Sequence, residues 1–71
     1  MTAIQIVYTF RSAEKMCTRI MNSAHVLTQL GWQEAKQRIV SRLGTTAELH
    51  KGFIEIDNMY DPDVLHSVLF Q

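Results

Sequence analysis

The segment WQEAKQRIVSRL, residues 32–43, decides the fold of this chain, because its apolar residues satisfy two periods at once. As a helix it groups Ala35, Ile39 and Leu43 on one face, contains good helix formers and ends at the glycine that follows it. As a strand it alternates the same apolar residues with basic ones, and residues 44–46 (GTT) form the turn of a hairpin. The choice between helix and strand therefore depends on the segments that flank residues 32–43.

Four flanking segments have clearer patterns. Residues 4–10 (IQIVYTF) alternate apolar side chains along one side and predict a strand, and residues 52–57 (GFIEID) predict another. Residues 12–30 begin with a serine N-cap, repeat apolar side chains at helical spacing and stop at a glycine, so they predict a helix. Residues 61–71 begin Asp-Pro-Asp, a helix start, and continue with a short apolar stripe that predicts a final helix.

The two interpretations of residues 32–43 give two folds. A strand there gives the order β-α-β-β-α, which is a ferredoxin-like fold without its last strand, with two helices on one face of a three-stranded sheet. A helix gives β-α-α-β-α. We favour the first, since a single pair of strands is marginal in water, whereas three strands covered by two helices enclose one core. Residues 1–71 are in either case a single small α+β domain.

The composition argues against catalytic and metal chemistry. The lone cysteine, Cys17, has no partner for an internal disulfide, and it falls on the apolar stripe of the predicted helix. His25, His50 and His66 lie far apart and lack metal-ligand spacing, and no glycine-rich loop suits a nucleotide. We therefore expect no enzyme, no cofactor and no metal. The absence of a long apolar run or a secretory signal predicts a cytoplasmic protein without a membrane span.

Charge is divided between the two parts of the chain, although the formal net charge is zero. Residues 1–42 contain six Lys or Arg and two Asp or Glu, whereas residues 43–71 contain one and five. Such a division can steer two copies together or steer the chain to a charged partner. Alternatively, the two parts complement each other within one monomer.

Residues 51–56 (KGFIEI) resemble the first half of the RNP1 signature of the RNA-recognition motif. That resemblance implies the order β-α-β-β-α followed by one more strand, with bases stacked on aromatic side chains. The family places such aromatics where this chain has Gln5 and Glu55. Together with the basic segment 36–51, the resemblance gives the alternative function, a small nucleic-acid-binding regulator.

The function that we favour is a non-enzymatic protein–protein interaction module. A domain of this length has a stability of only a few kcal/mol, and with neither crosslink nor metal we expect it to complete its core by association. We therefore expect a homodimer that acts as a small regulator, adaptor or inhibitor of another protein, of the kind that a phage or mobile element encodes. The residues expected at the partner-binding surface are Trp32, Lys36, Arg38, Arg42, Lys51, Phe53 and Tyr60.

Overall fold

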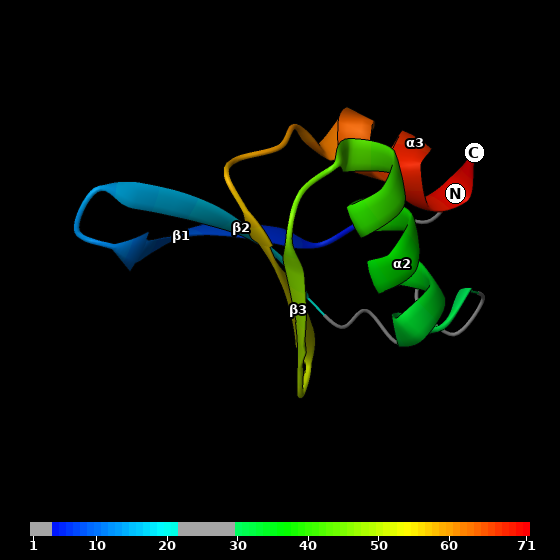
Figure 1. Ribbon diagram of the computed structural model, residues 1–71, viewed down its shortest axis with the longest axis horizontal. Helices are drawn as coiled ribbons and strands as arrows, with labels where there is room; N and C mark the ends of the chain where they lie inside the picture. Colours follow the sequence, from blue (N-terminus) through cyan, green and yellow to red (C-terminus); the bar gives the residue numbers. More distant parts are fainter. Residues whose placement is uncertain (1–3, 22–29) are drawn as a thin grey trace.

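The computed structural model describes residues 4–21 and 30–71, where the chain forms a four-stranded antiparallel sheet with two helices on one face (Figure 1). In chain order the elements are β1 (Ile6–Ser12), β2 (Lys15–Met21), α2 (Trp32–Leu43), β3 (Ala47–His50), β4 (Phe53–Asp57) and α3 (Pro62–Phe70). The strands lie in the order β1-β2-β4-β3. The α+β class is confirmed, but the three-stranded ferredoxin-like arrangement is not.

The core lies between the helices and one face of the sheet. A row of apolar side chains crosses all four strands, with Ile6 beside Ile20, Ile20 beside Ile54, and Ile54 beside Leu49. Both helices pack their apolar sides onto this face. The buried residues of the core are Ile20, Ala35, Ile39, Ile54, Ile56, Leu65, Val68 and Leu69.

The predicted helix 12–30 is wrong over residues 12–21, where the chain turns back and forms β2. The apolar residues Met16, Cys17, Ile20 and Met21 fit a helical stripe, but in β2 they divide between the two faces of the sheet, with Met16 and Ile20 on the face that carries the core. An antiparallel partner only a two-residue turn away satisfies the main chain of β1 at little entropic cost, and this outweighs the helical spacing. Residues 22–29, which include His25, lie outside the described part of the chain.

Residues 32–43 form a helix, so the strand that we favoured there is wrong and the helical interpretation of this segment is correct. The full alternative order β-α-α-β-α is nevertheless wrong, because residues 15–21 form β2. Ala35 and Ile39 are fully buried against the sheet and the neighbouring helix, as the helical period requires. Gly44 ends α2 in the left-handed conformation, with φ of 64°, and its N–H donates to the carbonyl of Val40 at 3.0 Å. A third strand is present in the sheet, but residues 15–21 supply it as β2.

The other predicted elements are present. The first strand is β1 and the second is β4, which buries Ile54 and Ile56 as expected. Helix α3 begins as predicted, because the side chain of Asp61 accepts a hydrogen bond of 2.7 Å from the N–H of Asp63. Strand β3 was not predicted, and it forms a tight hairpin with β4 in which Gly52 takes a φ of 100°.

The β1–β2 hairpin projects from the rest of the molecule (Figure 1). Its far end carries Phe10 and Met16 side by side on the face that continues the core, beyond the reach of the two helices. The described part of the chain is accordingly elongated, with principal extents of 35, 21 and 20 Å. No helix among the described residues has the length and apolar character needed to cross a membrane.

Candidate functional site

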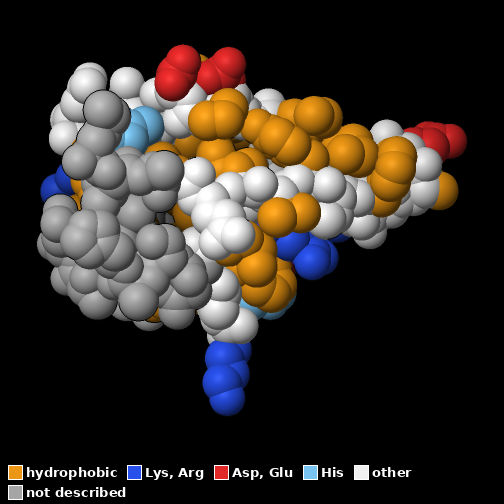
Figure 2. All heavy atoms as spheres, turned by 180° about the vertical axis from the view of Figure 1, so that it is seen from behind, with side chains coloured by type: hydrophobic (Ala, Val, Ile, Leu, Met, Phe, Trp, Pro, Cys, Tyr) orange, Lys and Arg blue, Asp and Glu red, His pale blue; other side chains and the backbone are white. Residues whose placement is uncertain are grey.

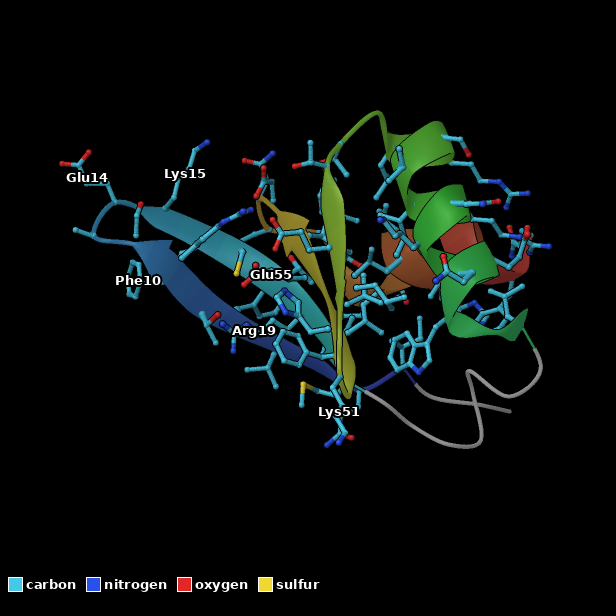
Figure 3. All side chains as sticks on the ribbon, turned by 60° about the horizontal axis from the view of Figure 1, so that its bottom comes forward. Phe10, Glu14, Lys15, Arg19, Lys51 and Glu55 are labelled. Carbon is cyan, nitrogen blue, oxygen red and sulfur yellow. The ribbon has the colours of Figure 1, made fainter. Side chains whose placement is uncertain are left out.

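The face of the sheet opposite the core carries most of the charged side chains of the strands, and no helix of the described residues covers it (Figure 3). The register places one row across it, in which Val7 neighbours Arg19, Arg19 neighbours Glu55, and Glu55 neighbours Glu48. We call this side of the sheet the open face. Two carboxylates directly opposite each other on adjacent strands repel, so the arrangement requires cations beside them.

Glu55 is the most deeply buried of these carboxylates, with only 9% of its side chain exposed. One oxygen, Oε2, lies 3.4 Å from Nη2 of Arg19 and 3.6 Å from the thiol of Cys17. The Arg19 guanidinium also lies over the ring of Phe53, 4.8 Å from its centre. Cys17 is buried, as expected, but it lies in a strand beside Thr9 and Glu55 rather than in a helix.

Arg11 connects the projecting hairpin to strands β4 and β3 across the open face. Its guanidinium donates to Asp57 and, at 3.1 Å, to Oε1 of Glu48. The hydroxyl of Thr46 donates to the second oxygen of Asp57 at 2.6 Å. This hydrogen bond, and then the charge of Arg11, hold the pKa of Asp57 below its ordinary value of 3.8, while the charges of Asp57 and Glu48 raise the pKa of Arg11.

His50 lies between the two facing glutamates. Its ring stacks on that of Phe53, with ring centres 4.5 Å apart and planes at 14°. Its Nε2 is 3.4 Å from Oε2 of Glu48 and 3.6 Å from Oε1 of Glu55. Although 37% of the side chain is exposed, this nitrogen atom is buried and has no hydrogen-bond partner.

The ion pairs of the open face join the basic first part of the chain to the acidic second part. Arg11 binds Glu48 and Asp57, and Arg19 binds Glu55. For these residues the divided charge is used within the monomer, which was one of the two interpretations of the sequence.

The second candidate surface is the outer edge of β1. The sheet has β1 at one edge and β3 at the other, and β1 is the longer, with seven residues against four. Strand β3 carries the charged Glu48 among its four residues, whereas the charged residue of β1, Arg11, lies near the end of that strand and residues 6–10 carry neither charge nor proline. Edge strands normally have such features, because they discourage pairing with another chain.

The hydrogen-bonding groups at this edge belong to alternate residues. The N–H of Met21 donates to the carbonyl of Gln5 at 2.8 Å, so the main chain of Gln5 faces β2. In an antiparallel ladder the N–H and C=O of one residue point to the same side, and consecutive residues alternate. The main-chain groups of Ile6, Tyr8 and Phe10 therefore point outward, away from β2.

Apolar side chains accompany this edge. Val7 is 40% exposed on the open face, and Phe10 is 69% exposed on the other face near the tip of the hairpin (Figure 3). Figure 2 shows hydrophobic side chains following the hairpin from the body of the molecule toward its tip. The hydroxyl of Tyr8 donates to the carbonyl of Tyr60 at 2.7 Å, which anchors the base of β1.

The structure does not bring the predicted partner-binding residues together. Trp32 is half-buried at the start of α2 and packs against the core, and Lys36 is half-buried on the same helix. Arg38 donates to Glu34 and to a carbonyl in the last turn of α3, and Arg42 donates to two further carbonyls there. These arginines lie on α2 and cap the end of α3, so the basic residues of segment 36–51 are divided between α2 and the β3–β4 turn.

The remaining three predicted residues are dispersed. Lys51 is exposed in the β3–β4 turn (Figure 3), and Phe53 lies on the open face. Tyr60 is half-buried before α3, where its N–H donates to the hydroxyl of Thr18 at 3.0 Å. The residues in contact on the open face form a charged cluster around Phe53. Its charged or titratable members are Arg11, Arg19, Glu48, His50, Glu55 and Asp57. Phe53 is thus the one predicted residue that belongs to the charged cluster of the open face.

The charged members of that cluster were not predicted as site residues. Arg19 was assigned to a helix, and Glu48 and His50 were assigned to no element. Two signals for the strands themselves were available. Thr18 and Ile20 are β-branched, which favours a strand, and Gly52 is typical of a tight turn.

Comparisons of this chain with protein-family models, curated proteins and solved structures found no match. The functional interpretation therefore depends on the geometry of the open face and of the β1 edge.

Proposed function

We propose that this protein is a protein–protein interaction module that works as a homodimer, in which the outer edges of two β1 strands pair antiparallel into one continuous sheet. The observation that carries the proposal is a seven-residue edge strand that projects from the body and carries exposed apolar side chains. The dimer acts as a small regulator, adaptor or inhibitor of another protein. A buried free thiol at Cys17 suits a cytoplasmic location.

A second copy of β1 is the occupant that best complements this edge. Antiparallel pairing about a two-fold axis is isologous, so each strand supplies the same donors and acceptors to the other. The outward groups of Ile6, Tyr8 and Phe10 would all find partners. The uncharged stretch 6–10 brings no like charges together, and the zero net charge of the chain adds no overall repulsion.

Apolar burial supports the same arrangement. Phe10 lies beyond the two helices, where it has little to pack against within one copy. In the paired sheet it would lie beside side chains of the same face on the partner's β1. A domain of this length gains the most from such burial, because it hides only about 60% of the surface of its unfolded chain by itself.

A pair of matched lysine substitutions tests the proposal. Val7 on β1 and Val40 on α2 have nearly the same exposed fraction, 40% and 39%. We expect wild type and Val40→Lys to sediment as dimers, and Val7→Lys to sediment as a monomer, because a charge on an edge strand opposes pairing. Far-UV circular dichroism checks that each variant is folded.

Two outcomes would contradict the proposal. A wild-type chain that stays monomeric at every concentration tested would exclude the dimer. A dimer that Val7→Lys leaves intact would place the interface elsewhere. If the β1-paired dimer is present, pull-downs with the dimeric wild type and the monomeric variant then show whether the regulated partner needs the paired form.

A further inference from the structure

We infer that Glu48, His50 and Glu55 form a binding site for one divalent transition-metal ion, with Zn²⁺ the best fit. One ligand atom of each residue lies within 4.8 Å of the other two. The three side chains come from the β3–β4 hairpin and share the open face, since Glu48 is opposite Glu55 and His50 is two residues further along β3. None of the three ligands lies on β1, the strand at the proposed dimer interface.

The distances around His50 fit two ligands of one ion better than a hydrogen bond. Its Nε2 is 3.4 Å from Glu48 and 3.6 Å from Glu55, longer than the usual 2.7–3.2 Å of an N–H···O bond. Two ligands of a tetrahedral zinc ion with bonds of 2.0–2.1 Å are separated by about 3.3 Å. Nε2 is also buried without a hydrogen-bond partner, which is costly unless a ligand binds this atom.

Each glutamate divides its two oxygens between an arginine and the histidine. Glu48 accepts a hydrogen bond from Arg11 at Oε1, and its Oε2 faces His50. Glu55 gives Oε2 to Arg19 and turns Oε1 toward His50. Hydrogen bonds of this kind to the second oxygen orient metal-ligating carboxylates, so the arginines prepare the two inward oxygens for a cation.

One imidazole and two carboxylates are ligands that suit Zn²⁺ and its neighbours among the transition metals. The site opens to solvent on the side of Glu48, which is 54% exposed and can adjust its position, whereas Glu55 is fixed by burial. Three protein ligands leave a fourth position of a tetrahedral ion for water or for a group from a partner.

The experiment is calorimetric titration of the purified protein with zinc chloride, alongside His50→Ala, Glu48→Gln and the control His66→Ala. His66 lies on α3 against Phe70, away from the site. We expect one ion per chain for wild type and His66→Ala. Loss of a residue that merely supports a ligand costs about 10- to 100-fold in affinity, so His50→Ala should bind at least about tenfold more weakly.

Proton NMR of the histidine rings gives a second readout. The ring signals that are missing from the spectrum of His50→Ala belong to His50. On addition of zinc to wild type, these signals should shift. If His50→Ala does not fold, Glu48→Gln decides, because it alters an exposed carboxylate and keeps the shape of the side chain. Absence of zinc binding by wild type would overturn the inference, as would equal affinities for wild type, His50→Ala and Glu48→Gln.

Discussion

Replacement of Thr18 by valine tests how strand β2 is joined to residues 58–60, which precede α3. Thr18 is fully buried in β2, and its hydroxyl donates to the carbonyl of Asn58 at 2.8 Å and accepts from the N–H of Tyr60 at 3.0 Å. Valine has nearly the same shape but no hydroxyl. The substitution therefore leaves two main-chain groups without partners and changes the packing little.

The expected loss of stability follows from those two groups. An unsatisfied buried group costs about 1–3 kcal/mol, and both of these are only partly buried, so we take about 1 kcal/mol for each. The sum, about 2 kcal/mol, lowers the Tm of a domain of this size by roughly 8 °C or more. Thr18→Ser keeps the hydroxyl and removes one methyl group, which costs about 0.8 kcal/mol.

Urea unfolding of the three proteins at one fixed concentration measures these differences. The fluorescence of Trp32, the single tryptophan, reports the transition because this residue packs against the core. We expect the order of stability wild type, Thr18→Ser, Thr18→Val, although valine is the most apolar of the three. A valine variant as stable as wild type, or more stable than the serine variant, would refute the structural role of the hydroxyl.

Three further predictions concern other contacts. Because the pKa of Asp57 is lowered by folding, the ionised carboxylate stabilises the protein above its ordinary pKa of 3.8 and loses this effect as pH falls through the lower folded value. In thermal melts Asp57→Asn should therefore be less stable than wild type at pH 6, and the difference should shrink as the pH falls below 3.8. Arg42→Met should lower the free energy of unfolding in urea by about 1 kcal/mol, because the end of α3 loses the cation that α2 provides. Lys36→Met, also on α2, should stay close to wild type. Asn58 has a φ of 73°, so Asn58→Gly should leave the Tm unchanged or raised, and Asn58→Ala should cost about 1 kcal/mol; the reverse order would contradict this conformation.

The elements that the sequence predicted correctly are those with local signals. Asp61 caps α3 through the N–H two residues later, and the alternation of Ile54 and Ile56 is confined to five residues of β4. Neither depends on a distant part of the chain. The same holds for the strand that begins at Ile6, whose β-branched and aromatic composition favours an extended conformation by itself.

The elements that were wrong depend on pairing between segments. Residues 15–21 carry apolar side chains at helical spacing, but the neighbouring β1 selects the strand because a hairpin satisfies both main chains. Because β2 pairs with both β1 and β4, the sheet forms without a strand from residues 32–43. They then follow their own helical propensity and bury Ala35 and Ile39 on top of the sheet.

The charged cluster of the open face was even less accessible from the sequence. Arg19 and Glu55 are 36 residues apart and become neighbours only through the register of β2 against β4. Similarly, Glu48 faces Glu55 only because the β3–β4 turn contains two residues. A one-residue change of register would move each of these side chains to the other face, so no local pattern could have identified the cluster.

Amide hydrogen exchange along β1, measured by NMR at two protein concentrations, tests the paired edge most directly. The amides of Val7 and Thr9 face β2 and should be protected at both concentrations. Those of Tyr8 and Phe10 point outward, so pairing with a second copy predicts slow exchange in the concentrated sample and faster exchange on dilution. Fast exchange of Tyr8 and Phe10 at both concentrations would contradict the account.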